Sequence, residues 1–214
     1  MVGIWNTYHQ DILSGLKVTL TASFIALICS LIIGTFMAML QVSTKKWVKK
    51  IGNIYVNFFR NIPLLIVVMF FFVVLPLYKI KFDGITSGTI GLTLYTSAFI
   101  ADTVRSGIEA IPKGQKEAGI ASGLSYLQVM YYIVLPQAFK VALPSLGNQF
   151  INLVKNSSIL AMVTGADLMY AGDLIASTTF NTLGTYTLIG LIYLMMTLPL
   201  SYAMRYLETR MATN

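Results

Sequence analysis

The sequence predicts an all-α integral membrane helical bundle of about five transmembrane helices, with one long loop between two of them. Of its 214 residues, 56% are hydrophobic and only 11% are charged, and the mean hydropathy is +0.73. Ordinary soluble domains carry about 25% charged residues, so a water-soluble fold could not cover this much apolar surface. The chain also contains about five stretches of roughly 20 mostly apolar residues, the length that crosses a bilayer.

The N-terminal residues 1–15 are expected to form a separate interfacial segment ahead of the first span. They lack the basic start and the small-residue cleavage site of a removable signal peptide. Trp5 and Tyr8 have the amphipathic rings that settle at the depth of lipid headgroups. We therefore expect a short helix over Trp5–Ser14 lying at the membrane surface.

The apolar stretches define a single transmembrane domain over residues 16–207, followed by a short tail at 208–214. The five expected spans are Leu16–Leu40, Asn53–Tyr78, Ile85–Ser106, Val141–Thr164 and Thr182–Tyr206. The second contains Pro63 and Pro76, which membrane helices tolerate when neighbouring groups satisfy the freed carbonyls.

Small residues recur every four positions along the first span: Ala22, Ala26, Ser30 and Gly34. This spacing places them on one face of a helix, where small side chains allow a second helix to approach closely. Packing within the bundle is the favoured interpretation, and an oligomer interface is the alternative.

Basic residues indicate the orientation of the chain. Most of them lie in the first loop, in the loop between the third and fourth spans, or at the C-terminus: Lys45, Lys46, Lys49, Lys50, Arg105, Lys113, Lys116, Lys140, Arg205 and Arg210. Lys and Arg concentrate on the cytoplasmic side of membrane proteins. The N-terminus is therefore expected outside the cell and the C-terminus in the cytoplasm.

The loop over residues 108–136 is longer than a connection between adjacent spans requires. Pro112 suits the first position of a helix that continues over Gln115–Ser122, and Gly123 then breaks it. A capping box formed by Ser125 and the glutamine three residues later predicts a second short helix, which Leu135 and Pro136 are expected to end. Two short helices at a sharp angle suit docking to a partner. A linker lying on the membrane surface is an equally good interpretation of these signals alone.

This loop resembles the coupling loop of the permeases of ATP-binding-cassette (ABC) importers. There the residues EAA are followed after three residues by Gly, and after nine more by I-x-L-P. The matching residues here are Glu117, Ala118, Gly119, Gly123, Ile133, Leu135 and Pro136. Gly119 stands where the family usually has Ala. The stretches FFRNIPLL, AFIADTVRSGI, IPKGQKEAG and LPQAFKVALPSLGNQFINLVKNSS resemble the branch that imports polar amino acids.

The resemblance implies a type I ABC importer permease in the bacterial cytoplasmic membrane. Its implied partners are a cytoplasmic ABC ATPase dimer, which binds ATP and Mg, a second permease chain, identical or homologous, and an extracytoplasmic amino-acid-binding protein. Glu117 would anchor the loop, and Leu124 and Tyr126 would offer apolar contact. The expected coupling residues are Gln115, Glu117, Ala118, Gly119, Ser122, Gly123, Leu124, Tyr126 and Pro136.

Two cations within expected spans, Arg60 and Lys155, are candidates for the substrate path. Charged side chains at membrane depth usually face a cavity, a partner charge or water. Snorkelling to the headgroups or pairing with a carbonyl is the alternative. The complete candidate set is Arg60, Asn61, Asn152, Lys155, Asn156, Ser157 and Ser158. The middles of the spans carry no acid, which favours a neutral or acidic amino acid such as glutamine or glutamate.

Several other functions are disfavoured. The basic residues form no stripe interleaved with aromatics, which argues against nucleic-acid binding. One cysteine and one histidine, Cys29 and His9, cannot assemble a Cys/His metal site. Neither a phosphate-binding G-x-x-x-x-G-K-[ST] loop nor a G-x-S-x-G elbow is present, so no catalytic residue and no cofactor of the chain's own is expected.

Two non-enzymatic alternatives remain. A self-sufficient secondary transporter would need paired inverted repeats or a broken-helix ion site within one chain, and about five spans without visible internal symmetry supply neither. A non-transporting membrane scaffold would have no reason to carry the coupling spacing.

Overall fold

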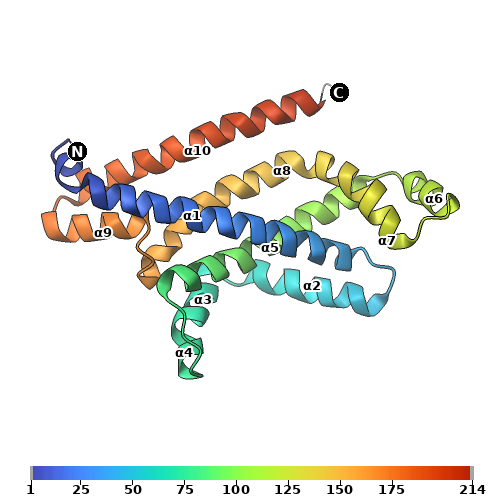
Figure 1. Ribbon diagram of the computed structural model, residues 1–214, viewed down its shortest axis with the longest axis horizontal. Coiled ribbons are helices and arrows are strands. Elements are labelled where there is room, and N and C mark those ends of the chain that lie inside the picture. Colours follow the sequence, from blue (N-terminus) through green and yellow to red (C-terminus); the bar gives the residue numbers. More distant parts are fainter. Residues whose placement is uncertain (1, 213–214) are drawn as a thin grey trace.

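The computed structural model describes residues 2–212, which fold as helices without any strand. The elements are α1 (Val2–Gln41), α2 (Lys46–Asn61), α3 (Leu64–Met69), η1 (Phe70–Val74), α4 (Leu75–Leu77), α5 (Gly84–Ala110), α6 (Lys113–Ala121), α7 (Tyr126–Val129), η2 (Met130–Val134), α8 (Leu135–Asn156), η3 (Ser157–Val163), α9 (Leu168–Thr179) and α10 (Thr182–Ala212). The long helices extend along one axis, with α9 and the N-terminus at one end and α6 and α7 at the other (Figure 1).

Among the described residues, three helical runs are long and apolar enough to cross a membrane. They are α1, the run Tyr126–Val163 from α7 through η3, and α10; the bent pair of α2 with α3–α4 makes a fourth. Helix α5 contributes many buried Gly, Ser and Thr residues and packs against α1, α2, α3 and α8. A helix enclosed by other helices presents little surface to lipid, so α5 does not need the apolarity of an outer span. The predicted helical membrane bundle is confirmed.

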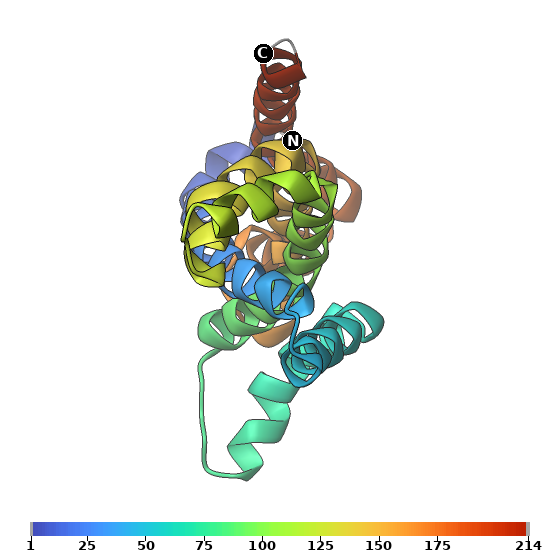
Figure 2. The ribbon, with the colours of Figure 1, turned by 90° about the vertical axis from the view of Figure 1, so that its right-hand side faces the viewer.

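The second expected span is not one continuous helix, and this part of the prediction is wrong. Helix α2 ends at Asn61, and the helical axis turns by 104° before α3 begins. Pro63 causes the break because its ring lacks an N–H and disfavours a helical conformation in the residue before it. Ile62 accordingly has φ −106° and ψ 138°. Figure 2 shows α3 and α4 projecting away from the bundle as a result.

The first span and the expected interfacial helix form a single helix. Helix α1 runs without a break from Val2 to Gln41. The small residues Ala22, Ala26, Ser30 and Gly34 are all buried, as the spacing predicted. A Cβ atom at Gly34 would lie 2.7 Å from the carbonyl oxygen of Ser97, so glycine allows α1 to touch the backbone of α5. The four-residue repeat therefore serves packing within the chain.

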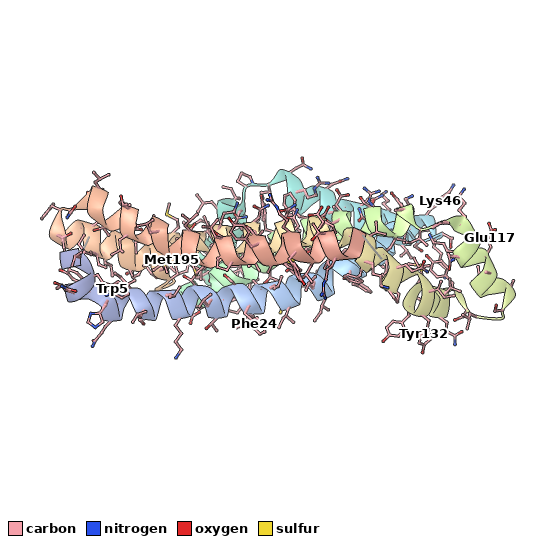
Figure 3. The ribbon with its side chains drawn as sticks, turned by 90° about the horizontal axis from the view of Figure 1, so that it is seen from above. Trp5, Phe24, Lys46, Glu117, Tyr132 and Met195 are labelled. Carbon is pink, nitrogen blue, oxygen red and sulfur yellow. The ribbon has the colours of Figure 1, made fainter. Side chains whose placement is uncertain are left out.

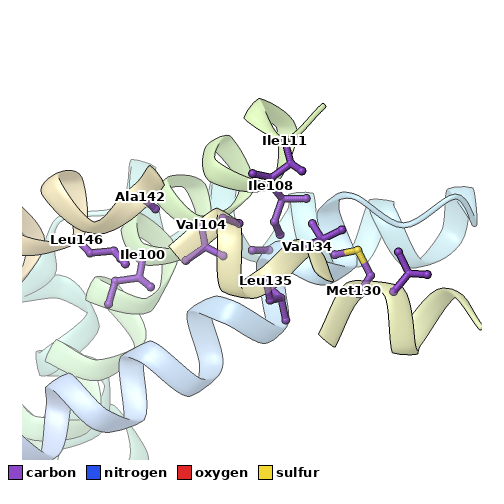
Figure 4. Packing of buried hydrophobic residues seen from close by; sticks show 12 residues of the cluster. Ile100, Val104, Ile108, Ile111, Met130, Val134, Leu135, Ala142 and Leu146 are labelled. Atoms are coloured by element: carbon purple, nitrogen blue, oxygen red, sulfur yellow. The ribbon is translucent and has the colours of Figure 1, made fainter. Parts of the chain in front are cut away.

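A hydrophobic cluster holds α5 to the α6–α7 end of the bundle. It includes Ile100, Val104 and Ile108 of α5, together with Met130 and Val134 of η2 (Figure 4). All five side chains are at most 1% exposed. Because buried apolar side chains generally pack as densely as organic crystals, we expect the last turns of α5 and the first turns of the next long run to move as one unit.

At the opposite end, a buried carboxylate fixes the start of α9. Asp167 accepts hydrogen bonds from the backbone N–H groups of Met169 and Tyr170 at 3.1 and 3.2 Å, which is the geometry of an N-cap. The backbone N–H of Leu168, the first residue of α9, donates to the hydroxyl oxygen of Thr19 on α1 at 3.0 Å. Burial raises the pKa of the Asp167 carboxyl above its usual value, and the N–H groups of Met169 and Tyr170 partly offset that rise.

Candidate functional site

The segment between α5 and α8 has the two-helix form that its sequence predicts. Helix α6 follows Pro112, and Gly123 turns the chain with φ +84°, a left-handed conformation that glycine adopts readily. Ser125 accepts from the N–H of Gln128 at 3.4 Å, and the Gln128 side chain accepts from the N–H of Ser125 at 2.9 Å. The predicted capping box is thereby confirmed.

The second short helix does not end at Leu135 and Pro136, so that prediction is wrong. A wide π-helical turn, η2, precedes Pro136, and the helix continues as α8 to Asn156. The side chain of Gln137 donates to the carbonyl oxygen of Ile133 at 2.8 Å. Neighbouring groups that satisfy freed carbonyls allow a proline to remain inside a membrane helix. Helix α7 is therefore the rigid tip of a long helix.

Gly119 lies where α6 packs against this long helix. A Cβ atom there would lie 2.7 Å from Cδ1 of Ile133 and 2.9 Å from Cγ2 of Val129. Glycine in place of the usual alanine thus brings α6 closer to η2. Leu124 is partly buried and packs against the hydrophobic cluster, whereas Tyr126 stays exposed.

The remaining expected coupling residues are exposed, and two of them make hydrogen bonds within the chain. Gln137 donates to the side-chain oxygen of Gln115 at 3.4 Å, and the hydroxyl of Ser122 donates to the carbonyl oxygen of Ala118 at 2.9 Å. Pro136 is exposed on the same segment.

Glu117 and four large apolar side chains are exposed at the α6–α7 end of the bundle. Together we call them the α6–α7 surface: Glu117, Ile120, Leu127, Tyr131 and Tyr132. The apolar four are 57%, 66%, 68% and 65% exposed, in that order. Within residues 2–212, Glu117 is exposed and makes no hydrogen bond or ion pair. Figure 3 shows Glu117 and Tyr132 at the same end of the molecule as Lys46. Sequence reasoning missed the four apolar residues, although apolar side chains in a loop with charged flanks are a recognisable signal of an interaction surface.

A cavity of about 430 Å³ lies beside η3, within the size range of ligand pockets. Its lining combines apolar side chains with an amide, a hydroxyl and a carboxylate: Leu64, Asn156, Ser158, Ile159, Ala161, Met162, Met169 and Asp173. We call it the η3 cavity. Asn156 and Ser158 were expected along the path, whereas Asp173 was missed because α9 lies outside the predicted spans. The hydroxyl of Tyr186 donates to Asp173 at 2.9 Å.

Three expected path residues near η3 do not line this cavity. Ser157 is fully buried and donates to the carbonyl oxygen of Val154 at 2.8 Å, so it faces the bundle. Asn152 and Lys155 are exposed. Lys155 has no ion-pair or hydrogen-bond partner for its ammonium group in the described part of the chain, which leaves its charge available.

The remaining two candidates, Arg60 and Asn61, lie at the end of α2. The guanidinium of Arg60 contacts the carboxylate of Asp102 at 2.9 Å and lies 5.5 Å from the centre of the Phe99 ring. Asn61 donates to the carbonyl oxygen of Asn57 at 2.7 Å. Arg60 is therefore already paired with a carboxylate of the chain itself.

Comparison with known proteins assigns this architecture to one family. Residues 30–213 match the family described as binding-protein-dependent transport system inner membrane component. The probable glutamine ABC transporter permease protein GlnM of Bacillus subtilis is 47% identical, over 93% of this chain and 92% of that protein. The arginine transport system permease protein ArtQ of the same organism is 33% identical, over 95% and 93%.

Solved structures agree with this assignment. The crystal structure of an amino acid ABC transporter with histidines superposes with a TM-score of 0.85 at 33% identity, covering 95% of each chain. An inward-facing MetNI methionine ABC transporter has the same fold, with a TM-score of 0.78 at 20% identity, covering 94% of this chain and 98% of that one.

Proposed function

The chain belongs to the inner membrane components of binding-protein-dependent transport systems and is the permease subunit of an ABC amino-acid importer, and on that premise we propose that it carries glutamine into the cell. The permease is not itself an enzyme, since the family is the membrane component of these importers. ATP and Mg belong to a separate ATPase dimer, and a second permease chain and an extracytoplasmic binding protein complete the transporter.

The α6–α7 surface is the docking site for the ATPase in this proposal. The observation that carries it is an exposed carboxylate without a partner in residues 2–212, Glu117, at the same end of the bundle as four exposed apolar side chains. Buried apolar anchors ringed by polar groups are the usual composition of a specific interface. Gly119 and Gly123 set the shape of this surface, and the continuous run into α8 transmits its displacement.

The orientation follows from the same surface. The basic residues of the first loop lie at the α6–α7 end of the bundle, as Lys46 shows in Figure 3, and Lys and Arg concentrate on the cytoplasmic side. This end, with the C-terminus, is therefore proposed to lie in the cytoplasm. The N-terminus and α9 then face the binding protein on the outside.

Glutamine is favoured by a relative and by the chemistry of the η3 cavity. A relative that is 47% identical is described as a probable glutamine permease. The cavity offers the Asn156 amide for hydrogen bonding to the glutamine side chain, and the Asp173 carboxylate as a countercharge for the α-ammonium group. Lys155, whose charge has no partner within residues 2–212, does not line the η3 cavity and would meet the substrate carboxylate at another point of the path. Asp102 is bound by two arginines, so it offers no countercharge to a cationic side chain.

Uptake by the complete transporter in lipid vesicles tests this function. The chain is reconstituted with its ATPase and binding protein, and radiolabelled glutamine uptake is measured with ATP at the ATPase side. We expect uptake to require ATP, to ignore an imposed proton or sodium gradient, and to be competed by glutamine at least about tenfold better than by arginine. A glutamine analogue that lacks the α-ammonium group should not compete. Better competition by arginine would overturn the glutamine assignment, and gradient-driven uptake without ATP would overturn the importer.

A further inference from the structure

Four charged side chains form a continuous chain from the end of α2 to the last turn of α5. Arg60 contacts Asp102 at 2.9 Å, Asp102 contacts Arg105 at 2.7 Å, and Arg105 contacts Glu109 at 2.8 Å. We call these four residues the ion chain. Helix α5 ends one residue after Glu109, and the α6–α7 segment follows at once.

Within the ion chain, one contact joins two different helices. The contacts of Arg105 are with residues three before it and four after it on α5, so they hold no second helix to α5. The Arg60–Asp102 contact instead links positions 42 residues apart. The guanidinium of Arg60 also lies over the Phe99 ring of α5 at 5.5 Å, so a charge-assisted hydrogen bond and a cation–π contact act together.

Arg60 lies two residues before the 104° bend, at the point where α2 could otherwise separate from α5. The other contacts between the bent pair and α5 are neutral. The hydroxyl groups of Tyr55 and Ser97 lie 2.6 Å apart, and Val68 of α3 packs against Gly91 of α5. Arg60 is thus the charged attachment of the bend to α5.

Helix α5 is in turn attached firmly to the segment that follows it. A Cβ atom at Gly107 would lie 2.6 Å from the carbonyl oxygen of Ala138, so α5 and α8 are in backbone contact there. The buried side chain of Ile108 packs in the same hydrophobic cluster as Met130. A displacement of α6 and α7 therefore carries the end of α5 with it. The bent pair of α2 and α3 moves with α5 only if the contacts between that pair and α5 stay intact.

On the premise of the proposed import function, we propose that Arg60 is a positioning residue that transmits motion of the α6–α7 surface to the bent helix pair. Its contact with Asp102 makes the bend move with α5 when the ATPase displaces the coupling end. Arg60 was a candidate for the substrate path on sequence grounds; in this proposal it acts through Asp102 and touches no substrate. Without this contact, the ATPase would still hydrolyse ATP, but fewer substrate molecules would be imported for each ATP hydrolysed.

The variant Arg60→Gln tests this role in the reconstituted complex, with glutamine uptake and ATP hydrolysis measured on the same vesicles. We expect uptake to fall about tenfold while hydrolysis changes by less than about twofold, so that the number of molecules imported per ATP falls. Lys50→Gln is the matched control, because it removes a cation from the exposed face of the same helix. It should leave the ratio unchanged.

Two further variants separate this role from simple stabilisation. Arg60→Lys keeps a positive charge and should restore part of the lost ratio. Asp102→Asn should lower the ratio, and combining it with Arg60→Gln should lower it no further, because both remove the Arg60–Asp102 contact and the other contact of Asp102 lies within α5. Uptake and hydrolysis that fall in proportion, or a ratio unchanged in Arg60→Gln, would overturn the proposal. If the Arg60→Gln transporter does not assemble, the number of molecules imported per ATP by Asp102→Asn tests the proposal instead: an unchanged number would overturn it. Absence of ATP-driven uptake in the unaltered chain would instead contradict the proposed function.

Discussion

Replacing Glu117 by lysine is expected to lower ATP-driven uptake at least about tenfold, while the permease itself folds normally. Glu117 is exposed and makes no hydrogen bond or ion pair within residues 2–212, so its replacement disturbs nothing inside the chain. Any effect on transport must therefore arise at a partner surface, where reversing a charge places like charges together. Uptake in vesicles and copurification of the ATPase measure the effect.

Glu208→Lys is the matched control for this variant. It reverses an exposed carboxylate on α10, away from the α6–α7 surface. Both variants should show the same thermal unfolding midpoint in detergent as the unaltered chain. Normal uptake and normal ATPase copurification in Glu117→Lys would show that the docking assignment is wrong.

Replacing Gly84 by valine is expected to have the largest effect on folding. Gly84 is the first residue of α5, and a Cβ atom there would run into the carbonyl oxygen of Val163 at the end of η3. Backbone cannot rotate away as a side chain can, so α5 and η3 must separate, which costs about 3 kcal/mol or more. The yield of monodisperse protein after detergent extraction, and its unfolding midpoint, should both fall sharply.

Gly190→Val serves as the control, because a Cβ atom at Gly190 meets no atom within 4 Å. Because the Cβ atom of a valine at position 190 would meet no neighbouring atom, this variant tests whether valine by itself disturbs a membrane helix. A Gly84→Val protein as abundant and as stable as Gly190→Val would contradict the close approach of α5 to η3.

Features set by local chemistry were predictable from the sequence. The capping box depends on Ser125 and Gln128 alone, and the left-handed turn depends on Gly123. The buried face of α1 follows from small residues spaced one helical turn apart. Each of these features requires only residues that are neighbours along the chain.

Three of the prolines, Pro63, Pro76 and Pro136, show where local reasoning fails. Pro63 breaks a helix. Pro76 and Pro136 each follow a π-helical turn, and the helix continues through them. Sequence reasoning placed the first two inside a span and expected the third to end a helix. The outcome depends on whether nearby groups donate hydrogen bonds to the freed carbonyls, and that is decided by tertiary packing.

Contacts between segments that are distant along the chain could not be predicted from the sequence either. Arg60 was recognised as a costly charge within a span, but its partner lies 42 residues away on another helix. Asp173 reaches the η3 cavity from α9, which the predicted spans had left out. Sequence reasoning identified residues that needed a partner or a cavity, and the fold determined which partner each one has.

Site-specific cross-linking tests the central claim, that the α6–α7 surface meets the ATPase, most directly. Cysteine is introduced as Ile120→Cys in a chain whose Cys29 is replaced by serine, and a short maleimide–diazirine reagent is attached and activated by light in the assembled transporter. Phe180→Cys is the matched site, since Phe180 is 89% exposed in the turn between α9 and α10, at the opposite end of the bundle. We predict that Ile120→Cys captures the ATPase subunit and Phe180→Cys does not. Capture of the ATPase from Phe180→Cys, with none from Ile120→Cys, would contradict the account.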